Sequence, residues 1–491
     1  MLFNSYIFIL AFLPITLLGY YFLNKFSLNK CSLIWLAIMS FVFYGYFNIF
    51  YLLILWTSIA TNYFVSRLLQ KKTTKLRLKK VIMFLGVLFN VGLIFYFKYY
   101  DFFIENINNI FYTSFEVKNI LLPLGISFFT FQQISYVIDS YKGETKDYTP
   151  LEYVVFVSFF PQLIAGPIVL HKEVIPQFRN KDGRCINWEN MAQGLCMFSL
   201  GLFKKVLIAD TFGKAVTYGY DNMAAISSLE AGLTMLSYTI QIYFDFSGYC
   251  DMASGVAKMF NIHLPINFDS PYKATSIVEF WNRWHMTLTR FLREYIYFPL
   301  GGSKKGKIRT YINILIVFLI SGIWHGANWT FILWGGIHGA ANVLNRIFKS
   351  SWERLHTVTQ WLLTFCFINF AWAIFRADNV VQGVKMIWKS INMRDLSLSN
   401  KFLAQFQLTE IAWITWIAKR IPGLRMLFLI NITGSAMWTM IIIAFFILLN
   451  CENCQRRKIF YNWRNVFAMS FLFMWALMSL SGVSTFLYFN F

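Results

Sequence analysis

Residues 311–345 read YINILIVFLISGIWHGANWTFILWGGIHGAANVLN. Two apolar runs, 311–324 and 329–345, contain no charged side chain and flank a short segment with a histidine, a glycine and an asparagine. Apolar runs of this kind are typical of helices in a lipid bilayer. Polar side chains at membrane depth are costly and mark functional sites. The stretch therefore predicts two membrane helices with a functional group between them.

The composition of the whole chain agrees with a membrane protein. Of its 491 residues, 57% are apolar, 20% are aromatic and 14% are charged. Soluble domains carry about 25% charged residues, so this composition excludes a soluble globule as well as a disordered chain. A formal charge of +21 would suggest nucleic acid on a soluble protein. Here the basic residues stand in short loops between apolar runs, so we expect contact with membrane lipids and no nucleic-acid partner.

Further apolar runs predict the membrane spans. They lie at 6–23, 32–46, 48–66, 81–98, 120–138, 151–170, 190–209, 227–245, 311–324, 329–345, 359–375, 436–450 and 465–487. Several are interrupted by glycine and proline, as in FFPQLIAGPIVL at 159–170. Irregular backbone survives in a membrane only where protein or a watery cavity satisfies it, so these breaks indicate a central cavity. We expect about 11 to 13 full spans plus re-entrant and interfacial helices in one integral domain over 1–491. The topology of 376–435 is left open.

Charged loops predict how the chain is oriented. Seven basic residues and no acidic one stand between 67 and 80, which predicts a cytoplasmic loop. Counting back three spans places the N-terminus outside, as an uncleaved span rather than a signal peptide. A second basic loop, 452–464, precedes the last run, so the aromatic C-terminal motif 486–491 is also expected outside.

The sequence offers little that would hold a metal. Among seven cysteines, Cys451 and Cys454 form a Cys-x-x-Cys pair that has no second pair and no nearby histidine. Structural zinc sites need four such ligands. The chain has no P-loop, no dinucleotide-binding glycine pattern and no HExxH motif. We therefore expect no metal and no bound cofactor.

Residues 276–295 combine aromatic, basic and histidine side chains. Ser276 stands three residues before Glu279, a pattern that predicts a helix start. Helical spacing then gives two chemically different faces. One face carries Trp281, His285, Leu288, Leu292 and Tyr295, and the other carries Arg283, Arg290 and Glu294. The arginines suit phosphate groups of lipid or of a thioester donor, although a plain interfacial helix explains the same pattern.

Residues 321–329, SGIWHGANW, place His325 beside Trp324 and Gly326 at the end of an apolar run. Glycine allows a ligand to approach the backbone closely. A dry environment favours neutral imidazole, which takes a proton from a hydroxyl or a thiol as a general base. A histidine that only bridges two helices is the alternative. For His338, thirteen residues further on, packing is the favoured interpretation over lining the same cavity.

Several stretches closely resemble the membrane-bound O-acyltransferase family, and within it the bacterial alginate O-acetyltransferase membrane-subunit group. The most specific are FWNRWHMTLTRFLREYIYFPLGG at 280–302 and SGIWHGANWTFILWGGIHG at 321–339. Others are PLGISFFTFQQISYVIDSYKG at 123–143, FPQLIAGPIV at 160–169 and YTIQIYFDFSGYCDMASGVAKMFNI at 238–262. The resemblance covers essentially the whole chain and implies a ring of helices around a central funnel.

The resemblance also implies roles for particular residues. The family's catalytic histidine falls on His325, and its second polar position falls on His285. The closing aromatic motif carries a tyrosine, here Tyr488, that takes up the acyl group in transit. The residues expected to contact the donor are Arg283, Arg290, Trp281, Trp324 and Asn328. Asn282 stands where many relatives have arginine.

The resemblance implies an acetyl transfer across the bacterial inner membrane. The donor would be acetyl-CoA or an acyl carrier thioester in the cytoplasm. A separate extracytoplasmic partner of the SGNH type, with a Ser-His-Asp site, would place the acetyl group on a polysaccharide. The acceptor favoured by the resemblance is an exopolysaccharide of the alginate or cellulose type. Peptidoglycan O-acetylation and D-alanylation of teichoic acid are alternatives, and an exporter or flippase for lipid-linked sugars is the alternative from another class.

Overall fold

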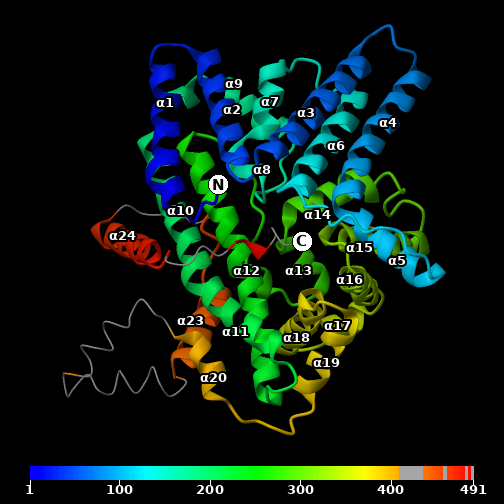
Figure 1. Cartoon of the computed structure of the whole chain (residues 1–491), viewed down its shortest axis with the longest axis vertical. Helices are drawn as coiled ribbons and strands as arrows, with labels where there is room; N and C mark the ends of the chain where they lie inside the picture. The colour runs from blue at the N-terminus through cyan, green and yellow to red at the C-terminus, as the bar shows by residue number, and fades with distance from the viewer. Residues whose placement is uncertain (408–419, 421–434, 457–461, 481–484, 488–491) are drawn as a thin grey trace. The chain divides into compact units, whose positions relative to one another are not determined.

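The computed structural model describes residues 1–407, 420, 435–456, 462–480 and 485–487. Within these ranges the chain is built from helices and connecting loops, without a β-strand (Figure 1). Its contacts divide the chain into two compact units. Of the described residues, 1–198 and 250–266 belong to unit 1, and 199–249 and those between 267 and 487 belong to unit 2.

Unit 1 holds the first half of the helices. They are η1 (Phe8–Phe12), α1 (Leu13–Lys25), α2 (Asn29–Gly45), α3 (Ile49–Gln70), α4 (Leu76–Ile94), η2 (Phe95–Tyr99), α5 (Tyr100–Phe111), α6 (Ile126–Lys142), α7 (Pro150–Ser158), α8 (Phe160–Leu163), α9 (His171–Arg179) and η3 (Asp182–Arg184). Helices α10 (Trp188–Phe203) and α12 (Ser228–Met259) contribute residues to both units.

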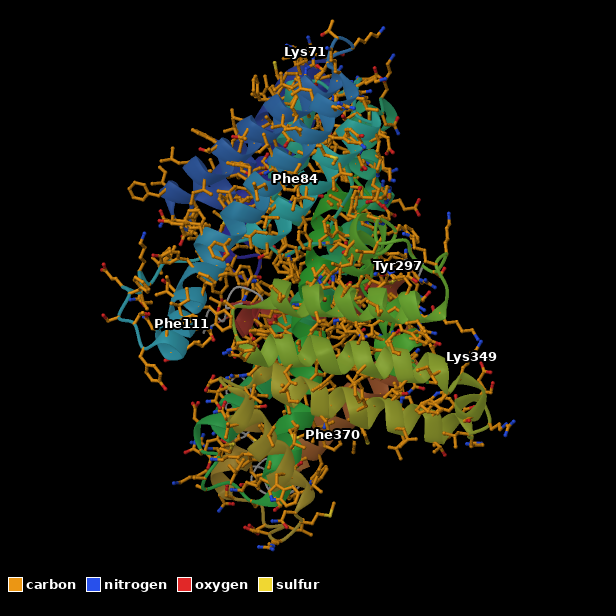
Figure 2. All side chains as sticks on the ribbon, turned by 90° about the vertical axis from the view of Figure 1, so that its right-hand side faces the viewer. Lys71, Phe84, Phe111, Tyr297, Lys349 and Phe370 are labelled. Atoms are coloured by element: carbon orange, nitrogen blue, oxygen red, sulfur yellow. The ribbon has the colours of Figure 1, made fainter. Side chains whose placement is uncertain are left out.

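Polar side chains inside unit 1 pair with one another across neighbouring helices. Asn62 of α3 donates to Asn90 of α4 at 3.1 Å, and Gln133 of α6 donates to Ser58 of α3 at 2.7 Å. Apolar side chains instead face outward, as Phe84 of α4 does with 62% of its surface exposed (Figure 2). Helices in lipid must satisfy their polar groups internally, and these pairs do so for the side chains that form them.

Unit 2 holds the remaining helices and the residues singled out by the sequence. The helices are η4 (Lys204–Ala209), α11 (Asp210–Asp221), η5 (Pro271–Lys273), α13 (Ile277–Arg283), α14 (Met286–Leu292), η6 (Arg293–Tyr297), α15 (Lys307–His325), α16 (Trp329–Ile347), α17 (Lys349–Glu353), α18 (Thr357–Arg376), α19 (Val380–Ile391), α20 (Asn400–Leu403), η7 (Ala404–Phe406), α23 (Ser435–Asn450) and α24 (Trp463–Met478).

Helices α15 and α16 form the predicted hairpin and pack closely through glycines. A Cβ atom added to Gly322 would meet the carbonyl oxygen of Phe331, and one added to Gly335 would meet that of Phe318. Small residues let membrane helices approach this closely. Asn328 starts α16, because its side-chain oxygen accepts the N–H of Thr330 at 3.0 Å. The hairpin thereby fixes the direction in which His325, at the end of α15, enters the unit.

The expected fold class, an all-α membrane protein, is confirmed. Five helical stretches in the described ranges are long and apolar enough to cross a bilayer: Phe8–Lys25, Ile49–Gln70, Leu76–Phe111, Lys307–His325 and Thr357–Arg376. Asn29–Gly45 and Ala436–Asn450 are shorter apolar helices. The expectation of about 11 to 13 spans stays a prediction.

Three predicted boundaries differ from the structure. The run 81–98 belongs to a helical stretch that continues to Phe111. In the last run, 465–487, helix α24 ends at Met478. The segment 276–295 is not one helix, because the chain leaves the helical path at His285. The break expected within 151–170 is present, since α7 ends at Ser158 and α8 is a single turn.

Candidate active site

The break at His285 is the first feature of the site. Ser276 caps α13 as predicted, accepting the N–H of Glu279 at 3.1 Å. His285 then adopts a left-handed backbone conformation with φ 45°, between α13 and α14. Such a conformation costs a non-glycine residue about 1 to 3 kcal/mol and occurs often at functional sites. The cost must be offset by contacts from elsewhere in the chain.

Asn267 supplies those contacts. Its carbonyl oxygen accepts the N–H of Met286 at 2.9 Å, and its side-chain oxygen accepts the N–H of Thr287 at 3.3 Å. In a continuous helix these N–H groups would pair with carbonyls one turn earlier. Asn267 replaces those acceptors, so the helix restarts at Met286 with His285 turned inward. No local sequence pattern predicts these contacts, because Asn267 lies nineteen and twenty positions before the two residues that it binds.

Asn267 also determines which nitrogen of His285 carries the proton. The distance from His285 Nδ1 to Asn267 Oδ1 is 3.0 Å. The Asn267 atom must be oxygen, because it also accepts a backbone N–H, which can only donate. Nδ1 of His285 therefore carries the hydrogen, and Nε2 carries a lone pair. His285 is fully buried, and desolvation by burial lowers its pKa to about 3, so the ring is neutral at physiological pH.

The structure brings His325 next to His285. Their ring centroids are 6.5 Å apart. The ring centroid of Trp324 lies 5.9 Å from that of His285 and 4.9 Å from that of His325. His325 is 3% exposed. The ring of Trp334 stands perpendicular to it at 5.1 Å, and the ring of Phe375 lies at 5.3 Å. Two buried imidazoles in an aromatic enclosure form the candidate centre.

The other predicted contact residues have different surroundings. Trp281 is buried and donates its Nε1–H to Nδ1 of His338 at 3.1 Å, which fits the packing interpretation of His338. Arg283 binds Glu279 at 2.9 Å and the carbonyl of Asp269 at 3.2 Å. The roles of Trp281 and Arg283 toward a donor stay predictions.

Arg290, Asn328 and Tyr488 complete the predicted set. Arg290 is half-buried on α14. The side chain of Asn328 is engaged at both ends, since it caps α16 and donates to the carbonyl of Asp378 at 2.8 Å. Tyr488 lies outside the residues that the structure describes. The assignment of donor contacts to Arg290 and Asn328 stays a prediction, as does the acceptor role of Tyr488.

A cavity of about 230 Å³ lies among α13, α14, η6, α15 and α16 of unit 2. Leu288, Leu292 and Phe318 give it apolar walls, and Arg293 and Arg346 bring positive charge to it. Ser321 also lines it, one helical turn before His325 on α15. The cavity therefore reaches the part of α15 that leads to the histidine pair. Arg293, Arg346 and Ser321 were not among the residues predicted to contact the donor.

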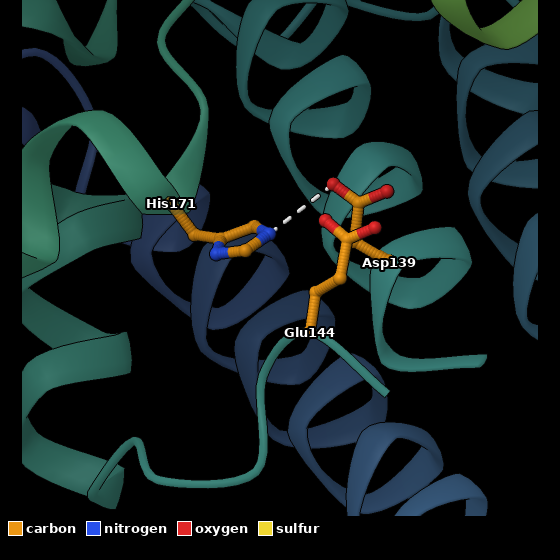
Figure 3. A group of neighbouring side chains, drawn as sticks. All are labelled: Asp139, Glu144 and His171. Carbon is orange, nitrogen blue, oxygen red and sulfur yellow. Dashed lines mark hydrogen bonds and ion pairs between the residues drawn. The ribbon is translucent and has the colours of Figure 1, made fainter. Parts of the chain in front are cut away.

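Unit 1 contains a group of side chains that could hold a cation, Asp139, Glu144 and His171, whose candidate ligand atoms lie within 4.8 Å of one another (Figure 3). Asp139 is already bound to Lys142 at 2.9 Å and to His171 Nε2 at 3.1 Å. The other nitrogen of His171 lies 3.1 Å from the hydroxyl of Tyr148. A cation would compete with the Lys142 ammonium, so we interpret the group as a hydrogen-bond network. The expected absence of a metal stays a prediction.

Comparison with known proteins establishes the family. A model of the membrane-bound O-acyltransferase family, MBOAT, matches residues 23–380, a range that contains His285 and His325 but ends before Tyr488. The chain belongs to this family. It is therefore an acyltransferase enzyme of the membrane.

Relatives with more specific names cover most of the chain. The peptidoglycan O-acetyltransferase of Helicobacter pylori is 45% identical over 428 residues, which is 81% of this chain and 81% of that protein. The probable alginate O-acetylase AlgI of Azotobacter vinelandii is 34% identical, over 89% of this chain and 87% of that protein. The teichoic acid D-alanyltransferase of Bacillus subtilis is 29% identical, over 52% of this chain and 69% of that protein.

Proposed function

We propose that the chain transfers an acetyl group from a cytoplasmic thioester to the outer side of the bacterial inner membrane, for O-acetylation of a glycan. The observation that carries this proposal is the pair of buried histidines, 6.5 Å apart in an aromatic enclosure. Between the two glycan classes, similarity favours peptidoglycan over an alginate-type exopolysaccharide, because identity is 45% to the peptidoglycan O-acetyltransferase and 34 to 37% to the alginate relatives.

In this proposal His325 is the general base. Its neutral ring takes the proton of an acceptor hydroxyl while that oxygen attacks the thioester carbonyl carbon. The carbon–sulfur bond then breaks, and the imidazolium returns the proton to the leaving thiolate. The products are an acetyl ester and a free thiol, so atoms and charges balance. General-base catalysis of this kind contributes about 10²- to 10⁴-fold to the rate.

His285 acts through the lone pair on Nε2. The sequence suggested that it orients or polarises the donor carbonyl. A neutral ring whose only N–H is bound to Asn267 cannot donate a second hydrogen bond, so polarisation of the carbonyl is disfavoured. We therefore give His285 the orienting role, in which Nε2 accepts a hydrogen bond from the attacking hydroxyl and aims it at the carbonyl.

We assign the thioester arm of the donor to the cavity beside α15. About 230 Å³ suits a narrow chain better than a complete nucleotide, because pockets for whole ligands span about 300 to 1,000 Å³. Arg293 and Arg346 are positioned for the phosphates of acetyl-CoA or of an acyl carrier, with Arg290 nearby in sequence. These residues are added to Arg283 as candidates for binding the donor phosphates. Arg283 itself is already bound to Glu279.

The rest of the route follows the sequence prediction. We propose that the hydroxyl acetylated in this active site belongs to Tyr488, and that an extracytoplasmic SGNH-type partner moves the acetyl group on to the glycan. A phenol is a poor nucleophile near neutral pH without a base, and His325 would provide one. Both chain termini would then lie on the outer side.

Ester-linked acetyl released from purified peptidoglycan and surface polysaccharide tests the proposal. Cells would carry the wild type, His325→Ala, Tyr488→Phe or the control His263→Gln, which changes an exposed histidine outside the site. We expect His325→Ala to abolish acetylation of one polymer at normal protein level, and Tyr488→Phe to do the same. Full acetylation in His325→Ala, together with loss of polymer export, would support the transporter alternative instead.

A further inference from the structure

The last described residues of the chain, Thr485, Phe486 and Leu487, are bound by a buried ion pair in unit 2. The pair joins Lys205 of η4 to Asp245 in the middle of α12, with 2.6 Å between Nζ and Oδ1. Each side chain is only 2% exposed. Buried charges of this kind are costly unless every donor and acceptor is satisfied.

The ion pair binds the backbone of the C-terminal segment at two points. Lys205 Nζ donates to the carbonyl oxygen of Thr485 at 3.2 Å, and Asp245 Oδ2 accepts the N–H of Leu487 at 3.0 Å. The two contacts lie two residues apart and use opposite charges. Together they fix both the register and the direction of the bound segment.

Lys205 has no spare donor for any other group. An ammonium has three N–H donors. Here one goes to Asp245 at 2.6 Å, one to Asp210 at 2.8 Å and one to Thr485 at 3.2 Å. Loss of the segment would strip a buried ammonium of one acceptor and a buried carboxylate of one donor, which strongly favours the bound state.

An aromatic contact adds a side-chain requirement. The ring of Phe486, which is 1% exposed, lies over the Lys205 ammonium at 4.8 Å and perpendicular to the ring of Tyr249 at 4.5 Å. Cation–π and edge-to-face contacts both favour an aromatic residue at this position. The side chain of Leu487 is only half-buried, so position 487 is held mainly through its backbone.

We infer that Lys205, Asp245 and Tyr249 form a socket that holds residues 485–487 and thereby positions the next residue, Tyr488, for acetyl transfer. This inference rests on the acceptor role of Tyr488 in the proposed function. Consecutive Cα atoms are about 3.8 Å apart, so holding Leu487 limits how far the residue bonded to it can move. Lys205 and Asp245 are positioning residues in this scheme, because they act on the reaction through the peptide that they bind.

Hydrogen exchange of the full-length protein in lipid nanodiscs tests the socket directly. In wild type, the amide of Leu487 should exchange slowly, because Asp245 accepts its hydrogen bond. Loss of a hydrogen bond to a charged group should lower its protection by about tenfold or more in Asp245→Asn. Peptides from α15 and α16 should keep their protection, whereas a general loss of structure would lower it everywhere.

A second pair of variants leaves the ion pair intact. Leu487→Pro removes the N–H that Asp245 accepts and fixes φ at this position, while it keeps Tyr488 and both charges. Leu487→Ala also truncates the side chain but keeps that N–H, so it is the matched control. We expect Leu487→Pro to lower acetylation of the C-terminal peptide, measured by intact mass, by about tenfold or more relative to Leu487→Ala. Equal acetylation of the two variants, or unchanged exchange in Asp245→Asn, would overturn the socket.

The two readouts separate this inference from the proposed function. If protection falls in Asp245→Asn while no acetyl group is ever found on Tyr488, the socket stands as a binding site for the C-terminal segment and its positioning role falls with the relay. If Tyr488 carries acetyl and Leu487→Pro leaves that unchanged, the relay stands and the socket is wrong.

Discussion

Replacing Asn267 with aspartate is expected to make the enzyme sensitive to acid. The substitution keeps the oxygen that accepts from Nδ1 of His285, 3.0 Å away, and adds a negative charge beside the ring. Two charges about 4 Å apart interact by about 4 kcal/mol at an effective dielectric constant of 20, which equals about three pKa units. The pKa of His285, now about 3, would rise to about 6.

The sign of the effect follows from the role of the lone pair. In the proposed mechanism His285 orients the hydroxyl only while Nε2 is unprotonated. In Asn267→Asp the ring gains a proton as the pH falls through about 6, so the ratio of variant to wild-type rate should drop about tenfold between pH 7 and pH 5. Wild-type His285 stays neutral down to about pH 3, so the ratio isolates this residue from other titrations.

The assay is acetyl transfer from acetyl-CoA in proteoliposomes between pH 5 and pH 8. Asn392→Asp, which adds the same charge at an exposed position on the end of α19, is the control and should give a constant ratio. A ratio for Asn267→Asp that stays constant across this range would refute the assigned proton position and the orienting role of His285.

Three further predictions concern packing, the donor cavity and metal. Gly335→Ala should lower the midpoint of thermal unfolding in detergent, because overpacking costs about 1 to 3 kcal/mol. Gly336→Ala is the control: its added Cβ would come no closer than 3.8 Å to Leu319, so the midpoint should stay unchanged. Ser321→Phe fills the cavity and should raise the KM for acetyl-CoA at least about tenfold at an unchanged midpoint; an unaltered KM would place the donor elsewhere. Treatment with EDTA should leave the transfer rate unchanged, and elemental analysis of the purified protein should find no stoichiometric metal. If EDTA removed zinc or calcium and activity together, the group around His171 would have to be interpreted as a metal site.

The pattern of apolar residues was sufficient to predict many of the helices and the fold class. The runs 311–324 and 329–345 correspond to α15 and α16, whose ends differ from the predicted ones by at most four residues. Long apolar runs carry their own signal, because lipid exposure demands an apolar surface over a full helix. The capping role of Ser276 was likewise predictable, since the residues involved are three positions apart.

The pattern of apolar residues could not predict tertiary contacts. Helical spacing runs unbroken through His285, yet Asn267 captures the N–H groups that would continue the helix. The proximity of His285 to His325 came from the resemblance to a family, because no local rule joins residues forty positions apart. The socket of Lys205 and Asp245 was not predicted for the same reason, since the two paired charges also lie forty positions apart in the sequence.

The helical stretch Leu76–Phe111 has a consequence for the shape of the membrane surface. Its 36 residues extend about 54 Å, whereas the hydrocarbon layer is about 30 Å thick. Even a tilt of about 40° leaves about 41 Å along the membrane normal, so part of the helix must lie beyond the hydrocarbon layer. Asp101 braces that end by accepting the N–H groups of Lys118 and Ile120, each at 2.9 Å. The result is a braced helix end outside the hydrocarbon layer, which a polymer or protein approaching that face of the membrane would meet first.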